Sequence, residues 1–200
     1  PEILDFGCGD GEMVELFAKS FKTSGLEPDE KARMLASECG GERIYANTDE
    51  VQELEKFFDV VTMFHVIEHF YDPDVEIARI YNLLKPSGVL FIETPSSQDA
   101  LLTKYENTEY QNFTYWSHHP MLHSKESLSS LLSRNGFEIL ENIGTQRHGL
   151  DNHLHWLSLG KPGGHDYWKG LVSAETNRLY ELDLVEKGIN DTLWLVAKRI

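Results

Sequence analysis

Cysteine, basic residues and long apolar runs are all scarce in this chain. Its 200 residues include only two cysteines, Cys8 and Cys39, too few for a disulfide framework, which favours a reducing, cytoplasmic compartment. Lys and Arg number 18 against 33 Asp and Glu, a formal net charge of −15. Because nucleic-acid affinity rests on Lys and Arg that displace counterions, and no basic cluster interrupts the acidic background, we expect no nucleic-acid partner.

No apolar run approaches the roughly 18–20 residues that a membrane span needs, and no signal peptide is visible, so we expect no membrane partner. The hydrophobic share of 40% and the aromatic share of 11% suit a globular core. We predict a single domain over residues 1–200. The chain opens with Pro1 and enters an apolar run at once, so we expect an N-terminal cap segment upstream. The oligomeric state is left open.

Short apolar segments alternate with segments of helical period. The strands are expected at residues 3–6, 23–28, 43–47, 58–67, 89–95, 137–144 and 191–199. This alternation predicts an α/β fold whose parallel sheet has helices on both sides. On such sheets, ligands bind beyond the carboxyl ends of the strands.

Two irregular stretches interrupt the pattern, an insert at residues 96–123 and another at residues 145–165. Loops this long in a compact domain are usually functional. We therefore predict that both inserts border the substrate side of the site.

A glycine loop follows the first strand, in the stretch "ILDFGCGDGEMVELF" at residues 3–17. Its Gly7, Gly9 and Gly11 permit positive φ and lack the Cβ atom that would block a ligand. Glu27 lies 20 residues beyond Gly7, where a carboxylate can take both hydroxyls of a ribose. These features predict a nucleoside-type ligand, and the GxGxG spacing differs from the GxGxxG of NAD-binding proteins.

Together with later motifs, this loop resembles a class I S-adenosylmethionine-dependent methyltransferase. The motifs are, in order, "ILDFGCGDG", "GLEP", "FDVVTMFHVIEHFYDP" and "LLKPSGVLFIETP". The later "HSKESLSSLLSRNGFEI" is similar to ubiquinone-biosynthesis O-methyltransferases, and "WLSLGKPGGH" resembles methyltransferases associated with polysaccharide synthesis. The resemblance implies a doubly wound, Rossmann-like α/β/α sandwich with seven strands, mostly parallel, the last one antiparallel.

The resemblance also implies a set of residues that hold S-adenosylmethionine and its product S-adenosylhomocysteine. They are Asp5, Gly7, Cys8, Gly9, Gly11, Glu27, Asn47, Thr48, Phe64, His65 and Val66. The four loop residues would meet the methionine part, Asp5 would orient the loop or the amino group, and Glu27 would bind the ribose. Asn47 or Thr48 would meet the adenine region, with an ordinary loop role as the alternative. The last three would lie under the cofactor near the methyl group.

Methyl transfer is an in-line displacement, so the protein mainly aligns the reactants, and a base is needed only where the acceptor carries a proton. Seven of the nine histidines lie after residue 117. We predict His118 and His119 as base candidates, because they follow the aromatic residues Tyr110, Phe113, Tyr115 and Trp116. The alternatives are solvated loop histidines and ordinary aromatic packing under a loop.

The spacing of His65, Glu68 and His69 resembles a set linked to a divalent ion in ubiquinone-type relatives, which carry a carboxylate first. Hard ions prefer oxygen ligands, so the histidine here argues against magnesium and we predict no metal. His153 and His155, two residues apart, are weaker evidence of a metal site.

Two classes of nucleic-acid methyltransferase are excluded by their motifs. The Asp/Asn-Pro-Pro-aromatic motif would follow the fourth strand, where this chain has "FHVIEHFYDP", and the Pro-Cys dipeptide of cytosine C5 enzymes is absent. We therefore expect methyl transfer to a small-molecule or sugar-like acceptor at oxygen. The alternatives are C- or N-methylation of a small metabolite, an NAD-dependent oxidoreductase, or a non-catalytic cofactor-binding domain.

Overall fold

A single mixed sheet organises the computed structural model, which describes residues 1–53, 57–116 and 119–200. The strands are β1 Glu2–Phe6, β2 Lys22–Leu26, β3 Ile44–Tyr45, β4 Phe58–Phe64, β5 Leu84–Pro95, β6 Phe137–Thr145 and β7 Thr192–Arg199. Their order across the sheet is β3-β2-β1-β4-β5-β7-β6. The first five strands pair in parallel, and β7 runs antiparallel to both β5 and β6. The predicted seven-stranded sheet with its antiparallel last strand is confirmed.

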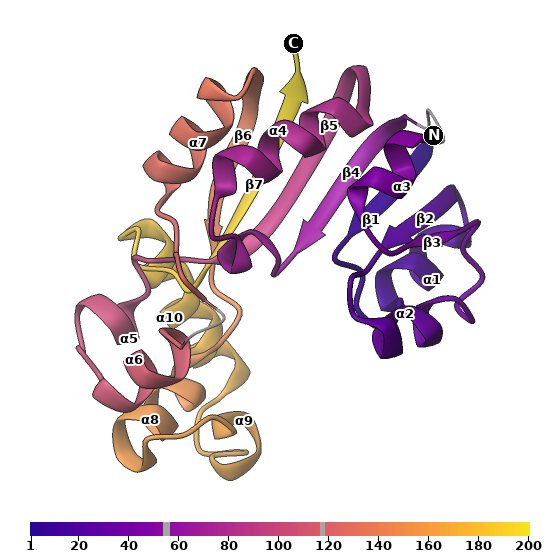
Figure 1. The fold of residues 1–200 in the computed structure, drawn as a ribbon. Coiled ribbons are helices and arrows are strands. Elements are labelled where there is room, and N and C mark those ends of the chain that lie inside the picture. Colours follow the sequence, from indigo (N-terminus) through magenta and orange to yellow (C-terminus); the bar gives the residue numbers. More distant parts are fainter. Residues whose placement is uncertain (54–56, 117–118) are drawn as a thin grey trace.

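Helices fill the connections between the strands. They are α1 Glu12–Ala18, α2 Glu30–Ala36, α3 Thr48–Glu53, α4 Pro73–Leu83, α5 Ala100–Thr103, α6 Thr108–Thr114, α7 Lys125–Arg134, α8 Leu150–Leu159, α9 Gly164–Tyr167, α10 Ala174–Glu186 and the 3-10 helix η1 Ile67–His69. In Figure 1, α4 and α7 lie across one face of the sheet, and α5, α6, α8 and α9 gather beyond the end of β4. No helix within the described ranges is both long and apolar enough to cross a bilayer.

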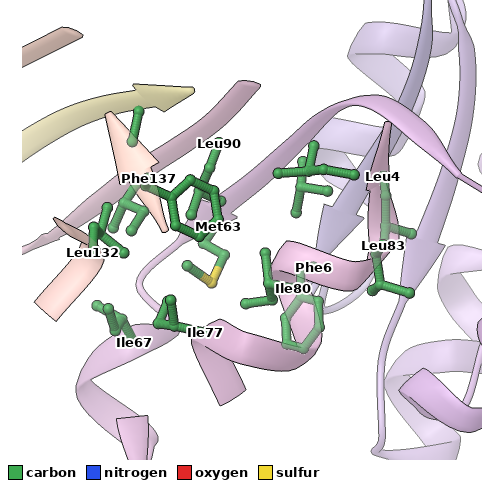
Figure 2. Packing of buried hydrophobic residues seen from close by; sticks show 14 of the residues in the cluster. Leu4, Phe6, Met63, Ile67, Ile77, Ile80, Leu83, Leu90, Leu132 and Phe137 are labelled. Carbon is green, nitrogen blue, oxygen red and sulfur yellow. The ribbon is translucent and has the colours of Figure 1, made fainter. Parts of the chain in front are cut away.

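The main core lies between α4 and the central strands (Figure 2). Ile77, Ile80 and Leu83 recur at helical spacing along one face of α4 and are buried. They pack in the same cluster as Met63 of β4 and Leu90 of β5. Each such side chain stabilises the fold by roughly 1.5–3 kcal/mol through its burial, which fixes the carboxyl ends of β4 and β5 beside each other.

The fourth strand ends earlier than the sequence predicts. The apolar run at residues 58–67 was expected as one strand, but β4 ends at Phe64. His65 has a φ of 56°, a left-handed conformation that breaks the extended backbone. The chain then turns into η1, which places the side chains after Phe64 at the edge of the sheet.

Both inserts contain regular structure where an irregular chain was expected. The first holds α5 and α6, and the second holds α8 and the start of α9. Asp99 caps α5 by accepting a hydrogen bond from the Leu101 backbone, and Asn107 caps α6 in the same way through Tyr110. These helices of the first insert are 4 and 7 residues long, too short to show a helical period in the sequence.

Candidate active site

The glycine loop adopts the conformation that its composition predicts. Gly7, Gly9 and Gly11 have φ values of 75°, 54° and 94°. A Cβ atom on Gly11 would lie 2.8 Å from the Ala36 Cα atom, whereas one on Gly9 would meet no heavy atom within 4 Å. Gly11 therefore serves the packing of α1 against α2, and Gly9 faces open space.

Glu27 closes over this loop from the end of β2. Its Oε2 accepts a hydrogen bond of 2.9 Å from the Gly9 backbone N–H, and its Oε1 accepts one of 2.8 Å from the Asp29 backbone N–H. The structure thus brings together the carboxylate and the glycine that the sequence singled out. The carboxylate is held in one orientation beside the open space over Gly9.

Asp5 and Cys8 are buried beneath the loop. Asp5 accepts a hydrogen bond of 2.8 Å from Thr62 Oγ1, and burial raises its pKa to about 6 against the effect of that bond. Burial also raises the pKa of the Cys8 thiol to about 12, with Asp5 and Glu27 adding to the effect. The Cys8 thiol is therefore protonated, and its small buried side chain contributes to packing in the loop.

Asn47 and Thr48 stand at the start of α3. The Asn47 side-chain oxygen accepts a hydrogen bond of 3.0 Å from the Glu50 backbone, which caps the helix, and Thr48 is buried. This is the ordinary structural role that was the alternative to a contact with adenine. The adenine contact stays a prediction.

Phe64, His65 and Val66 lie where the glycine loop meets the end of β4. The Phe64 ring contacts Phe17 of α1 and Phe91 of β5. A Cβ atom on Gly7 would fall 2.6 Å from Val66 Cγ2, so Val66 packs directly against the loop. The residue between them, His65, lines the cavity described below.

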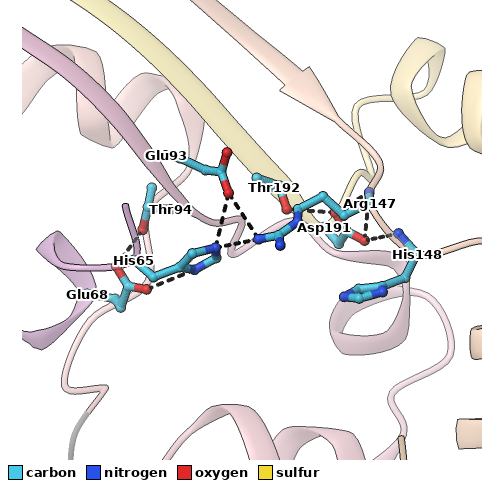
Figure 3. A network of polar contacts seen from close by, with 8 residues as sticks. All are labelled: His65, Glu68, Glu93, Thr94, Arg147, His148, Asp191 and Thr192. Atoms are coloured by element: carbon cyan, nitrogen blue, oxygen red, sulfur yellow. Dashed lines mark hydrogen bonds and ion pairs between the residues drawn. The ribbon is translucent and has the colours of Figure 1, made fainter. Parts of the chain in front are cut away.

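A polar network surrounds His65 (Figure 3). Its Nδ1 lies 3.4 Å from Glu68 Oε1, and its Nε2 lies 3.1 Å from Glu93 Oε1. Arg147 Nη1 contacts that same His65 Nε2 and lies 3.0 Å from Glu93 Oε1. Thr94 Oγ1 donates a hydrogen bond of 3.0 Å to Glu68 Oε2. An imidazole is thus held between two carboxylates and one guanidinium.

These contacts shift the pKa values of His65 and the buried Glu68 in opposite directions. The hydrogen bond to Glu68 raises the pKa of His65, against the effects of burial and of Arg147. Burial opposes ionisation of Glu68, but hydrogen bonds from His65, its own backbone and Thr94 together hold its pKa below the usual value. The pair therefore favours a charged Glu68 and a readily protonated His65.

A cavity of about 560 Å³ opens beside this network. Its wall is formed by His65, Pro95, Tyr110, Asn112, Phe113, Thr114, Trp116, His119, Arg147, His148, Asp191 and Thr192. Both inserts contribute to that wall, together with the ends of β5 and β7. The cavity thus combines aromatic surface with groups that can donate or accept protons.

The two histidines predicted as bases have different outcomes. His118 lies outside the described residues. His119 lines the cavity, with its Nδ1 3.0 Å from the Thr114 carbonyl oxygen and its ring against His69 and Trp116. Because a carbonyl can only accept, Nδ1 carries the proton and Nε2 is left with a lone pair. A role for either histidine in catalysis stays a prediction.

The aromatic residues before them divide between packing and the cavity. Tyr110 packs edge-on against Trp156 and donates a hydrogen bond of 2.7 Å to Asp99 Oδ2. Phe113 and Trp116 line the cavity while remaining exposed. Both interpretations of this sequence stretch therefore apply, to different side chains.

Glu93, Arg147 and Asp191 belong to the site but were not predicted. Asp191 accepts hydrogen bonds of 3.0 Å from the backbone N–H groups of both Arg147 and His148, which directs these residues toward the cavity. Glu93 was recognisable as a carboxylate at the end of a parallel strand beside the motif. Arg147 lies 82 residues from His65, and no local pattern connects the two.

The metal set suggested by the spacing of His65, Glu68 and His69 does not fit a hard ion. Both ring nitrogens of His65 are engaged, one by Glu68 and one by Glu93 and Arg147. Glu68, His69 and His119 do place one ligand atom each within 4.8 Å of one another, but Glu68 already accepts from Thr94. The absence of a catalytic metal stays a prediction.

The second histidine pair belongs to the packing of α8. His153 Nδ1 lies 2.8 Å from the Tyr180 hydroxyl, and burial lowers its pKa to about 4. The His155 ring is buried against Tyr167. The two rings take different partners, so they do not form a paired site.

Comparisons with known proteins agree with the motifs. The family model described as a methyltransferase domain matches residues 1–142. A ubiquinone biosynthesis O-methyltransferase of Vibrio campbellii is 37% identical over 101 residues, which cover 46% of this chain and 43% of that enzyme. The chain thus spans less than half the length of this relative. A probable S-adenosylmethionine-dependent methyltransferase of Mycolicibacterium smegmatis is 26% identical, covering 98% of this chain and 80% of that protein.

Solved structures share the fold. A methyltransferase of Thermotoga maritima, described as a possible histamine N-methyltransferase, superimposes with a TM-score of 0.64 at 19% identity, covering 100% of this chain and 82% of its own. A methyltransferase of Bacillus halodurans, described as putative, superimposes with a TM-score of 0.65 at 19% identity, covering 99% of this chain and 92% of its own. At these identities the likeness shows the fold alone.

Proposed function

This chain belongs to the methyltransferase domain family, and we propose that it transfers the methyl group of S-adenosylmethionine to an oxygen of a small-molecule or sugar-like acceptor. The observation that carries the proposal is the junction at the end of β4. Val66 packs against the glycine loop on one side, and its neighbour His65 lines the cavity on the other. A donor on the loop and an acceptor in the cavity would therefore meet at this point.

The loop has the room and the polar groups that the donor requires. Gly9 faces open space, and the Glu27 carboxylate beside it is fixed by two backbone hydrogen bonds. When bound, S-adenosylmethionine supplies a methyl group already activated by its sulfonium. The chain's remaining task is to hold the two reactants in line, and a preorganised geometry can supply much of the rate.

The cavity supports an acceptor that carries a ring. Phe113 and Trp116 offer aromatic faces, and His119, His148 and Arg147 offer polar groups on the same wall. Transfer to oxygen is favoured by the 37% identity to an enzyme named as an O-methyltransferase. From the sequence alone, His118 and His119 are the proposed bases for an acceptor hydroxyl. The acidic surface favours a small cytoplasmic substrate over a nucleic acid.

Calorimetry tests the donor assignment. We expect S-adenosylmethionine and S-adenosylhomocysteine to bind with micromolar-range affinity, and Glu27→Ala to weaken both by about 1.5–3 kcal/mol, the value of a charged hydrogen-bond pair. The matched control is Glu30→Ala, an exposed acid on α2, which should leave both affinities unchanged. Tighter binding of NAD than of S-adenosylhomocysteine would overturn the assignment.

Product analysis tests the acceptor class. The protein is incubated with S-adenosylmethionine and a panel of phenols, catechols and sugar nucleotides, alongside amines of matched shape. We expect S-adenosylhomocysteine to be released with a hydroxylated member, and proton and carbon NMR of the product to show an O-methyl group. If only the amines are methylated, the proposal of transfer to oxygen is wrong and the enzyme transfers the methyl group to nitrogen.

A further inference from the structure

We propose that His65 accepts the proton that the acceptor hydroxyl loses, oriented by the buried Glu68, with Glu93 as a second carboxylate for the resulting imidazolium. This inference rests on the proposed function, because it concerns the same transfer to oxygen. It assigns to His65 the step proposed from the sequence for His118 or His119, and it gives the unpredicted Glu93 and Arg147 a place in that step.

The position of His65 is the first observation. It lines the cavity, and it lies between Phe64 and Val66 at the junction with the glycine loop. Its φ of 56° lies in the left-handed region, which few residues other than glycine adopt. The backbone holds this conformation through a hydrogen bond of 2.9 Å from His65 N–H to the Glu93 carbonyl. An extended residue here would continue β4 instead of turning at this junction.

The orientation of the ring is the second observation. The Glu68 carboxylate is 1% exposed and is itself fixed by Thr94. Carboxylates face both ring nitrogens, Glu68 at Nδ1 and Glu93 at Nε2, so the donor that also contacts Nε2 decides the tautomer. With the ring proton on Nδ1, held by the buried Glu68, Nε2 is the acceptor, the arrangement found where a buried acid orients a catalytic histidine. Arg147 Nη1, which can only donate, contacts Nε2 and agrees with this tautomer.

The charges facing the ring are the third observation. Glu68 approaches from η1, Glu93 from β5, and Arg147 from the segment after β6. Once Nε2 is protonated, Glu93 Oε1 at 3.1 Å can accept from it, while Glu68 holds Nδ1. A full positive charge on the ring is therefore placed between two carboxylates, the geometry that stabilises an imidazolium.

Arg147 occupies the position that an acceptor hydroxyl would need. In the structure its Nη1 satisfies Nε2 and also pairs with Glu93 at 3.0 Å. The acceptor hydroxyl would replace the first contact, and Arg147 would keep the second. Because Asp191 fixes the Arg147 backbone, this exchange needs only a side-chain rotation.

The proposed step balances in atoms and charge. The acceptor oxygen forms a bond to the methyl carbon as the bond between that carbon and the sulfonium sulfur breaks, its electron pair staying on sulfur. The hydroxyl proton moves to His65 Nε2. The positive charge of the sulfonium thus becomes the positive charge of the imidazolium, and the products are the methyl ether and S-adenosylhomocysteine.

His119 is less suited to the same step. Its Nδ1 faces the Thr114 backbone carbonyl, a neutral acceptor that stabilises an imidazolium less than a carboxylate does. The Glu68 carboxylate lies 3.4 Å from His65 Nδ1, whereas the backbone carbonyl oxygen of Thr114 lies 3.0 Å from His119 Nδ1. The two histidines therefore make different predictions for the same measurement.

Imidazole ¹⁵N NMR of the S-adenosylhomocysteine complex tests the inference without an acceptor. The His65 signals are assigned by their loss in His65→Asn, since Asn tolerates a left-handed φ. We expect the proton of neutral His65 on Nδ1, and we expect Glu68→Gln to lower the His65 pKa while His165 does not respond. His165 is a matched control, because it also faces a carboxylate, that of Asp166, but is exposed. A proton on Nε2, or an unchanged His65 pKa in Glu68→Gln, would overturn the inference.

Kinetics on any hydroxylated acceptor of the panel form the second arm. We expect His65→Asn to lower kcat, measured at saturating S-adenosylmethionine, by roughly 100-fold or more, the usual value of a general base. The limb of the pH profile on which the rate rises with pH should move to lower pH in Glu68→Gln. If kcat of His65→Asn stays within threefold of the kcat of the original protein, the role of His65 is refuted and the proposed function stands. If the original protein does not bind the donor, the proposed function itself is refuted.

Discussion

Single glycines in the loop have separate tasks, although the motif treats them alike. Gly9 faces open space, and Gly11 is closed in by Ala36 and Cys39. Both have positive φ, so both share a conformational requirement. What distinguishes them is the neighbour that an added methyl group would meet, which the sequence does not show.

An alanine at each position should separate these tasks. Gly11→Ala adds backbone strain and a collision with the Ala36 backbone, so we expect the free energy of unfolding to fall by about 1–3 kcal/mol. Gly9→Ala meets no neighbour and should cost only about 1 kcal/mol, but it should weaken S-adenosylhomocysteine binding at least tenfold. Urea unfolding and calorimetry measure the two effects. Equal losses of stability in both variants would contradict the distinction.

Asp5 makes stability depend on pH through its burial. Its pKa is raised from 3.8 to about 6, so the folded state binds the proton more tightly than the unfolded state. Stability from this residue is therefore full below about pH 4 and is lost as pH rises toward 6, by up to about 3 kcal/mol. Asp99 has a pKa raised by burial to about 6 and acts with the same sign.

Comparison with an amide isolates this contribution. The free energy of unfolding is measured with urea for Asp5→Asn and for the original protein. We expect the value for Asp5→Asn minus the value for the original protein to increase by up to about 3 kcal/mol between pH 4 and pH 7. Asp10→Asn, an exposed acid in the same loop, should show no such trend. A difference that is flat over this range for Asp5→Asn would show that the carboxyl ionises freely in the folded state.

Among the larger elements, the segment between β6 and α8 depends on one side chain. Asp191, which immediately precedes β7, accepts hydrogen bonds from the Gln146 side chain and from the backbones of Arg147 and His148. Its Oδ1 also accepts from Thr192 Oγ1. The wall of the cavity formed by this segment is thus held to the sheet by Asp191 as well as by the ion pair of Arg147 with Glu93.

Removing that carboxylate should release the segment. We expect Asp191→Ala to raise the rate of tryptic cleavage after Arg147 about tenfold, since losing buried hydrogen bonds to a carboxylate costs 1.4 kcal/mol or more. Asp183→Ala removes an exposed pair with Lys187 and should leave this cleavage unchanged. Mass spectrometry of timed digests identifies the cut site. Equal cleavage in the two variants would show that Asp191 does not hold the segment.

The strands and the donor loop were predictable because their signals are local. Apolar runs such as residues 58–67 indicate buried strands, and the loop and Glu27 lie within 20 residues of each other. The end of β4 was misplaced because nothing in the residue type of His65 requires a left-handed backbone. The first insert was expected to be irregular because its helices are short and capped by polar side chains. In the second insert, α8 and α9 begin after Gly149 and Gly163 without a side-chain cap, so no N-cap residue indicated their start in the sequence. Arg147 reaches His65 only through the folded sheet, so its place could not be predicted.

Charge acts on the molecule as a whole. The net charge of −15 makes the compact state repel itself, and this repulsion is screened over about 8 Å at physiological salt but over about 30 Å at 0.01 M. Ion pairs such as that of Arg134 with Asp74 are exposed, so their attraction offsets little of this repulsion. The folded protein should therefore be sensitive to ionic strength.

Thermal unfolding tests this sensitivity. We expect the Tm to rise by roughly 2–4 °C between 0.01 and 0.15 M NaCl, which corresponds to about 1 kcal/mol for a chain of this size. Screening depends on ionic strength, so sodium chloride and potassium chloride at equal ionic strength should give the same rise. A Tm that falls with added salt would mean that attractive ion pairs outweigh the net repulsion.

The order of strands has a consequence for synthesis on the ribosome. The strand β6 is bonded in the sheet only to β7, and β7 also completes the pairing of β5. Since β7 is made some fifty residues after β6, the growing polypeptide carries an unpaired β6 while α8, α9 and α10 are translated. The half that holds the glycine loop can therefore assemble early, whereas the half that holds the cavity closes only when residues 192–199 have been made.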